Sequence, residues 1–185
     1  EHAARAIWTL CMAVENQRVI VEGGAIPELV GLFKTGSQAA QGYAAAVISE
    51  LSKGALAARN AEPTGNDAVS DPEIPDTASS QDGELLTQCA VAIPSLVALL
   101  NTGSEMAKEQ AVGALWQLST ISAHRDAIAK AGGVPPIIQL LDDGTPAAYA
   151  HVVAVLARLA EGAPDNQTQI AKKLVTLLTS PNEGA

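Results

Sequence analysis

Apolar residues recur along the chain with the spacing of amphipathic helices. Val152, Leu156 and Leu159 are separated by four and three residues, so a helix over this stretch would bury them on one side. Ile137, Leu140 and Leu141 would form such a buried side in the preceding stretch. The alternation of period two that indicates strands is nowhere sustained. The pattern therefore predicts an all-α protein.

Proline, glycine and hydroxyl residues mark the expected helix boundaries. Thr145 is a good N-cap because its hydroxyl can accept a free amide hydrogen, and Pro146 suits the first helical position, where no N–H is needed. Ser37 and Ser104 occupy the equivalent places. We expect the glycine before each cap, such as Gly144, to take a positive φ and end the previous helix in a tight turn. For this part of the chain the predicted helices are 122–131, 135–141 and 146–160.

The same arrangement of boundary residues occurs three times, which indicates an internal repeat. A proline opens each middle helix and a glycine closes it nine residues later, at Pro27 and Gly36, Pro94 and Gly103, and Pro135 and Gly144. The second and third copies are 41 residues apart, and the first and second 67, so a period of 41 is interrupted once by 26 residues. Helices this short cannot bury their apolar faces alone, so the units must stack as a solenoid.

The segments "NQRVIVEGGAIPELVGLFKTGSQAAQGYAAAVISELS" and "AHRDAIAKAGGVPPIIQLLDDGTPAAYAHVVAVLARLA" resemble armadillo repeats. This resemblance, over residues 1–54 and 81–185, implies a right-handed α-α superhelix of three-helix units whose third helices line a concave, partner-binding groove. We expect a single solenoid over 1–185 of about four repeats, the first and last incomplete. The expected parts are a third helix of a truncated repeat at 1–13, repeats at 14–54, 81–121 and 122–162, and a partial repeat at 163–185. Because the partial repeat lacks the Gly-Gly-x-Pro bend, its first two helices are expected to run together.

The 26 extra residues, 55–80, have a composition unlike that of the repeats. They contain five acidic residues, one arginine and three prolines but no aromatic residue, so they cannot bury enough apolar surface to become ordered. We expect an acidic, disordered insertion, most simply a tolerated surface loop. The alternative is a docking strand or an acidic tether for a basic partner.

Charge and cysteine content limit the partners and the compartment. The net charge of −9, without any Lys/Arg cluster, argues against nucleic-acid binding through phosphates. The longest apolar run is broken by a proline and is too short to span a bilayer, so membrane insertion is not expected. Two cysteines do not make a disulfide framework, which favours an intracellular, cytoplasmic location, with the nucleus also open.

The resemblance implies a non-catalytic scaffold that binds another protein or an extended peptide. In importin-α-like repeats, an Asn near the end of each third helix clamps the peptide backbone, and a Trp lies four residues earlier. Here the Asn places hold Thr9, Glu50, Gln117 and Arg158, and the Trp places hold Arg5, Ala46, Gly113 and Ala154. Trp8 and Trp116 are one residue before the Asn place and so are not the family's groove tryptophans. The missing arrays count against a nuclear-import-type cargo adaptor, and a second alternative is the substrate-recognition array of a multidomain ubiquitin ligase.

The helical phase still predicts which residues face the groove. These candidates are His2, Arg5, Thr9, Tyr43, Glu50, Gln110, Gln117, His151 and Arg158. The alternative interpretation is an ordinary solvated face. Further repeats or a partner subunit are expected to cover the two ends of the solenoid, since neither end has the polar cap that solenoids need.

No catalytic, metal or cofactor site is predicted. His2 and His151 occupy equivalent places more than two units apart, so they are too distant to share a metal ion. His124 is expected in an exposed first helix, and Cys11 and Cys89 lie among apolar neighbours, as small core residues do. No nucleophile and base are suggested at matching depth, so we do not expect an enzyme.

Overall fold

The computed structural model describes residues 1–61, 81–161 and 163–179, and the regular structure within them is entirely α-helical. The prediction of an all-α fold is confirmed. The first helices of the units are α2 (Val14–Glu22), α5 (Gln81–Ala90) and α8 (Ser122–Lys130), and the second helices are α3 (Ala25–Thr35), α6 (Ile93–Thr102) and α9 (Val134–Asp143). The third helices are α1 (His2–Cys11), α4 (Gln38–Ala61), α7 (Glu105–Leu118) and α10 (Pro146–Ala160). The last described helix is α11 (Pro164–Thr179).

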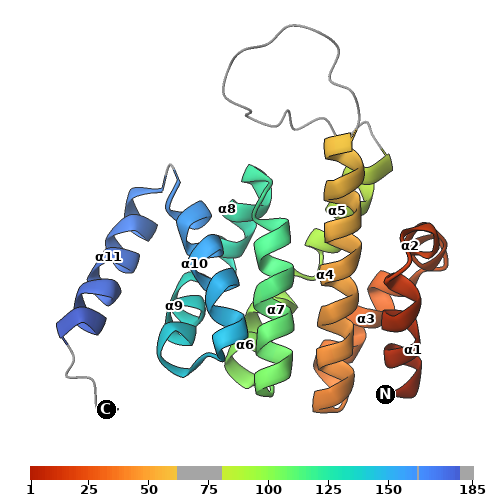
Figure 1. Cartoon of the computed structure of the whole chain (residues 1–185), viewed down its shortest axis with the longest axis horizontal. Coiled ribbons are helices and arrows are strands. Elements are labelled where there is room, and N and C mark those ends of the chain that lie inside the picture. The colour runs from red at the N-terminus through yellow and green to blue at the C-terminus, as the bar shows by residue number, and fades with distance from the viewer. Residues whose placement is uncertain (62–80, 162, 180–185) are drawn as a thin grey trace, which may run out of the picture.

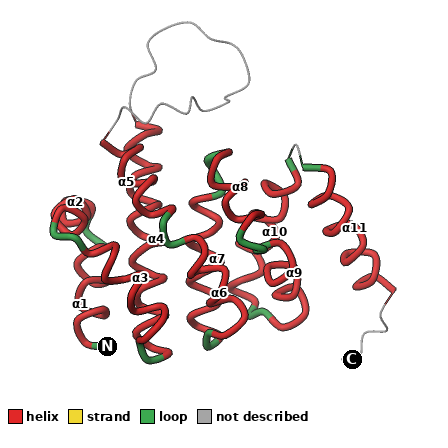
Figure 2. Tube along the Cα trace, turned by 180° about the vertical axis from the view of Figure 1, so that it is seen from behind, coloured by secondary structure: helices red, strands yellow, loops and turns green. Residues whose placement is uncertain are grey.

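The third helices stand side by side on one face of the molecule (Figure 1). Helix α4 packs against α1 on one side and α7 on the other, and α7 in turn packs against α10. The second helices α3, α6 and α9 lie behind this row (Figure 2). One continuous apolar core runs between the two rows, with fully buried side chains such as Leu51, Leu96, Leu115 and Ile137. Each unit therefore completes the core of its neighbour.

Hydroxyl caps start the third helices, as the sequence predicts. The side chains of Ser37, Ser104 and Thr145 each accept a hydrogen bond from the backbone N–H three residues later, at 3.2, 3.3 and 3.3 Å. Pro146 occupies the first turn of α10. These bonds satisfy amide groups that no helical carbonyl can reach.

The glycines before these caps are required for a different reason from the predicted one. Gly36, Gly103 and Gly144 have φ values of −75°, −75° and −79°, so the expectation of positive φ is wrong. A Cβ there would lie 2.6, 2.7 and 2.2 Å from the carbonyl oxygen four residues earlier. The chain leaves the helix too close to its own last turn for any side chain. Positive φ occurs instead at Gly24 and Gly132, just before the second helices α3 and α9.

Helix α4 is longer than the sequence predicts. It continues to Ala61, and Ala55 and Leu56 are buried in the core, with exposed fractions of 2% and 8%. The predicted insertion therefore does not begin at residue 55, because residues 55–61, which start with the apolar Ala-Leu-Ala, add almost two helical turns. Residues 62–80, the rest of that predicted segment, lie outside the described residues. The prediction that the last unit's first two helices merge is confirmed by α11.

A side chain from the following helix caps the C-terminal end of three third helices. The carbonyl that accepts occupies the same repeat place each time, and the donor is the fourth residue of the following helix: Gln17 Nε2 to Cys11 O at 2.8 Å, Arg125 Nη1 to Ser119 O at 3.2 Å, and Gln167 Nε2 to Ala160 O at 2.7 Å. These carbonyls have no partner within their own helix. The caps therefore fasten the corner between one unit and the next.

Gln17 is the most constrained of these donors. It is only 5% exposed, and its Nε2 also donates to the Glu50 carbonyl of α4, at 3.3 Å. A Cβ added to Gly54 would lie 1.9 Å from Gln17 Oε1. Gly54 therefore makes room for the buried cap.

We predict that Gly54→Ala lowers the free energy of unfolding by about 1–2 kcal/mol. The substitution must displace an amide that makes one buried and one partly buried hydrogen bond, and the gain in helix propensity offsets only part of that loss. Urea denaturation followed by circular dichroism measures the change. Gly31→Ala is the matched control, because Gly31 lies within α3 with nothing within 4 Å of a Cβ, and it should raise the free energy by up to about 1 kcal/mol. A stabilised Gly54→Ala protein would contradict the proposed role of Gly54.

Candidate partner-binding face

The predicted groove residues lie on four neighbouring helices, which we call the third-helix face (α1, α4, α7 and α10). His2, Arg5 and Thr9 on α1 are exposed. The other six, Tyr43, Glu50, Gln110, Gln117, His151 and Arg158, are half-buried. The structure thus brings all nine onto adjacent helices, but their side chains differ in how far they are already engaged.

Two aromatic contacts join neighbouring helices at equivalent places of the repeat. The Trp8 ring on α1 and the Tyr43 ring on α4 have centroids 5.7 Å apart with planes inclined by 33°. The Trp116 ring on α7 stacks on the His151 ring of α10, with centroids 5.0 Å apart and planes at 29°. Neither tryptophan is among the residues that the helical phase predicts for the groove. Their shared place in the repeat, one residue before the Asn place, is the signal that could have included them.

Arg158 is engaged within the chain. Its Nη1 donates to Trp116 O at 2.8 Å and Thr120 Oγ1 at 2.8 Å, and lies 3.5 Å from Ser119 Oγ. Its guanidinium carbon lies 5.7 Å from the centre of the Trp116 ring. Burial lowers the pKa of Arg158, while Glu161 raises it and Arg125 lowers it further. Arginine nevertheless stays charged, so Arg158 joins α10 to the C-terminal end of α7.

The middle of the face carries polar side chains whose hydrogen-bonding groups are not used within the described chain. The side-chain amides of Gln110 and Gln117, both on α7, make no hydrogen bond to another described residue. Gly113 lies between them, where a Cβ would be 3.6 Å from His151 Nδ1 and 3.7 Å from Ser49 Oγ. Each glutamine amide offers two donors and one acceptor oxygen. This part of the face can therefore hydrogen-bond to a peptide backbone.

The histidines do not form a metal site. His2 is on α1 and His151 on α10, with α4 and α7 between them. Across the described ranges no group of three or more His, Cys, Asp or Glu side chains could hold a metal ion. His124 lies in first helix α8 but is only 8% exposed, so the expectation that it is exposed is wrong. Its side chain is buried because one side of the otherwise polar helix α8 packs toward the core.

The two cysteines are buried thiols. Burial raises the pKa of Cys11 to about 11, and the charge of Glu50 adds to this effect. Burial likewise raises the pKa of Cys89 to about 12, with Cys11 raising it further and a hydrogen bond with Ser52 opposing the shift. Neither thiol forms the reactive thiolate near neutral pH.

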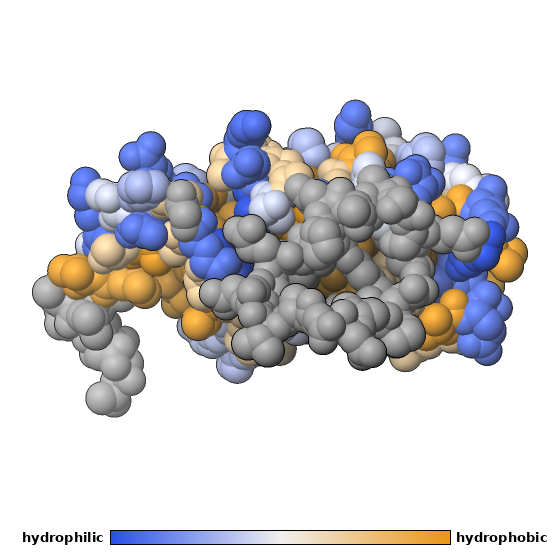
Figure 3. Space-filling view, turned by 90° about the horizontal axis from the view of Figure 1, so that it is seen from above, coloured by the Kyte–Doolittle hydropathy of each residue, from blue (hydrophilic) through white to orange (hydrophobic). Residues whose placement is uncertain are grey.

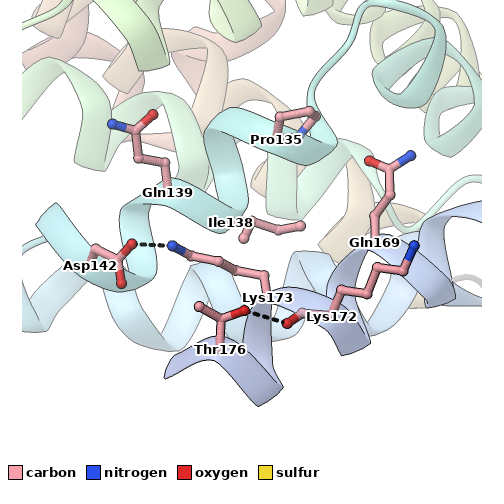
Figure 4. Close-up of a pocket in the computed structure, with 8 residues that line it drawn as sticks. All are labelled: Pro135, Ile138, Gln139, Asp142, Gln169, Lys172, Lys173 and Thr176. Atoms are coloured by element: carbon pink, nitrogen blue, oxygen red, sulfur yellow. Dashed lines mark hydrogen bonds and ion pairs between the residues drawn. The ribbon is translucent and has the colours of Figure 1, made fainter. Parts of the chain in front are cut away.

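A cleft lies away from this face, between α9 and α11 (Figure 4). It has a volume of about 570 Å³, and an ion pair between Lys173 and Asp142 spans it. Its other polar lining comes from glutamine, threonine and a second lysine. The pair neutralises both of its charges, and the lining contains no side chain that could serve as a strong nucleophile.

By length and composition, no single helix in the described part of the chain could cross a membrane, although the bent pair Gly83–Ala90 and Ile93–Thr102 passes that test when taken together.

The comparisons with known proteins agree with this architecture. The family model of the armadillo/beta-catenin-like repeat matches residues 86–120. A crystal structure described as computationally designed armadillo repeat proteins for modular peptide recognition is similar over 98% of this chain, with a TM-score of 0.70 and 22% identity. The chain therefore has the fold of an armadillo-repeat solenoid.

Other solved structures resemble this armadillo solenoid to different degrees. An engineered protein matches 98% of the chain with a TM-score of 0.69 and 23% identity. The chain spans 69% and 66% of the lengths of these two structures. A designed armadillo repeat protein in complex with the peptide (KR)4 covers 98% of the chain at 20% identity, with a TM-score of 0.50. No curated protein matches the sequence. At these identities the likeness establishes the fold.

We predict that Arg158→Ala destabilises the armadillo solenoid by about 2 kcal/mol, because hydrogen bonds from a charged group to the end of α7 are lost. Thermal and urea denaturation measure the change. The control is Arg18→Ala, which removes an ion pair between side chains that are 65% and 61% exposed, and should cost less than about 0.5 kcal/mol. Equal effects of the two substitutions would show that Arg158 does not join the units.

We also predict that both thiols of the native armadillo solenoid are inert to Ellman's reagent at pH 8. Cys11 and Cys89 are completely buried, and their raised pKa values keep them protonated. In denaturant both should react at once, and absorbance of the released thiolate counts them. Rapid reaction of either thiol in the native protein would contradict the described packing.

Proposed function

We propose that this chain is a non-catalytic protein-interaction scaffold that binds a partner protein or an extended peptide along the third-helix face. The observation that carries the proposal is the pair of half-buried glutamines on α7, Gln110 and Gln117, whose amides are unused within the described chain. The proposed contact residues are His2, Arg5, Thr9, Tyr43, Glu50, Gln110, Gln117, His151 and Arg158. Arg158 acts mainly by positioning Trp116, because its Nη1 is engaged with the end of α7.

The dimensions of the face suit an extended segment. Four helices packed about 8–10 Å apart span roughly 30 Å, which an extended chain crosses with about nine residues. Glutamine amides can pair with both the N–H and the carbonyl of a peptide backbone. Two of the similar structures are described as made for modular peptide recognition and as bound to (KR)4, which supports the same use of the fold here.

Narrower roles rank below this proposal. A nuclear-import-type adaptor would use Asn and Trp arrays, whose places hold other residues here. A substrate-recognition array of a ubiquitin ligase would use the same face. Only the presence of a separate catalytic domain would distinguish that role from a general scaffold. We place the scaffold inside the cell, in the cytoplasm or nucleus, because its two cysteines are unpaired.

We further propose that additional repeats or a partner subunit cover the ends of the solenoid. Apolar side chains are visible at both ends of the molecule (Figure 3). At one end Leu10, Met12 and Val14 are exposed, and at the other Leu174 and Val175 on α11. Stacked repeats bury such end surfaces.

Selection from a random peptide display library tests the binding face. Peptides selected on the unaltered protein should bind the double variant Gln110→Ala/Gln117→Ala at least about tenfold more weakly, because backbone hydrogen bonds are lost. Fluorescence anisotropy of the labelled peptides measures the Kd.

Gln88→Ala is the matched control, because Gln88 lies on first helix α5 and donates to Glu84 on the same helix. It should leave the Kd within twofold. Peptides that bind the double variant and the unaltered protein equally would place the binding surface elsewhere.

A further inference from the structure

One side of helix α1 is exposed although the same side of every other third helix is buried. Ala3, Ala6 and Leu10 lie on this side, at positions i, i+3 and i+7, and Leu10 is 52% exposed. The equivalent residues of α4, α7 and α10 are at most 1% exposed: Ala44, Val47, Leu51, Ala111, Ala114, Leu118, Val152, Val155 and Leu159. Those three helices each pack on the second helix of their own unit, whereas no described helix precedes α1. Helix α1 therefore presents a third-helix surface without the helix on which it packs.

The opposite end of the solenoid has the reverse arrangement (Figure 1). In α11 the sequence Leu-Val-Thr-Leu-Leu, at 174–178, repeats Leu-Val-Ala-Leu-Leu, at 96–100 of second helix α6, in all but one residue. Leu174 is 44% exposed, while the equivalent residues Leu29, Leu96 and Ile137 are at most 1% exposed. Helices α3, α6 and α9 each pack on a third helix, and among the described residues none follows α11. Helix α11 therefore presents a second-helix surface without its third helix.

Helix α10, the last third helix of the row, is exposed on the side away from α7. Val153 is 59% exposed, whereas the equivalent residues Ala4, Ala45 and Val112 lie in helices followed by another third helix and are at most 2% exposed. Single exposed apolar side chains are ordinary on a protein surface. Leu10, Val153 and Leu174 differ from these, because the same repeat places are buried wherever a neighbouring unit is present. The two ends thus carry the two halves of the contact that joins units within the chain.

We propose that a second copy of this chain covers these ends, with its α1 lying against α10 and α11 of the first copy. This inference deepens the proposal that a partner subunit covers the ends, and it does not depend on peptide binding at the third-helix face. Leu10 of the second copy then packs with Leu174 of the first, as third and second helices pack within a unit. Its α1 also lies beside Val153, as α4 lies beside α1. The contact between copies continues the stacking of units within one copy.

This contact joins two different surfaces, which determines how the assembly grows. Each pair of copies keeps one free α1 surface and one free α10–α11 surface. Such a heterologous contact extends as an open chain of copies unless the rotation between them closes a ring. Burial of apolar side chains drives the association, so it depends on protein concentration.

Sedimentation velocity of this chain, from about 1 μM to about 1 mM, tests the proposal. The weight-average sedimentation coefficient of the unaltered protein should rise with concentration. Leu10→Glu and Leu174→Glu each place a charge in the contact and should raise the Kd for association at least about tenfold. An equimolar mixture of the two variants should form dimers and nothing larger, because it retains one intact pair of surfaces. Association between two identical surfaces would not be restored in this way.

Val91→Glu is the matched control, because Val91 is an exposed apolar residue at the turn between α5 and α6 of a middle unit. It should leave the sedimentation of the protein unchanged at every concentration. Thermal melts followed by circular dichroism report whether each variant is folded, and the recovery of dimers in the mixture shows independently that both variants keep an intact surface.

Three results would overturn the second copy as the occupant. They are an unaltered protein that stays monomeric at every concentration, association that survives both end substitutions, and a mixture of variants that stays monomeric. Gln110→Ala/Gln117→Ala should leave sedimentation unchanged, and Leu10→Glu and Leu174→Glu should leave the Kd of selected peptides unchanged. Failure of peptide binding at the third-helix face is therefore distinguishable from failure of self-association at the ends.

Discussion

The structure depends on satisfying the carbonyl groups at the C-terminal ends of third helices α1, α7 and α10. A helix end leaves such groups without partners, and in a solenoid they fall at the corner where one unit passes to the next. Gln17, Arg125 and Gln167 reach back from the following helix to these carbonyls. Apolar stacking drives the units together but is not directional, whereas these bonds set where the next helix begins. Gly54 follows from the same constraint, because the buried Gln17 amide needs its space.

The corner and the binding face are parts of one arrangement. Because these caps set where the next unit starts, equivalent residues meet where α1 contacts α4 and where α7 contacts α10. Trp8 therefore meets Tyr43 as Trp116 meets His151. Regular stacking lets a repeat protein vary the chemistry along its face while the core stays the same. Here that variation runs from the Trp8–Tyr43 contact, through the polar region of Gln110 and Gln117, to the Trp116–His151 contact.

Much of the fold was predictable because the residues that begin and end helices recur at equivalent places in each repeat. Ser104 and Thr145 cap helices as expected, since capping is a local interaction that residue type decides. Features that depend on neighbouring elements were not predictable. The negative φ of Gly144 reflects a close approach to the preceding turn, and the burial of His124 depends on which side of α8 faces the core. The sequence located the candidate face by phase, but only the contacts show that Arg158 is already engaged and that the two tryptophans belong to it.

Equivalent contacts between third helices differ in one polar residue. Between α7 and α10, the Arg158 guanidinium lies over the Trp116 ring and donates to Trp116 O, so this contact contributes to stability. Between α1 and α4, Glu50 fills the repeat place of Arg158, and Trp8 still meets Tyr43. The aromatic contact therefore does not depend on the charged residue at that place, and a repeat can change its charge there while the packing beneath it stays the same.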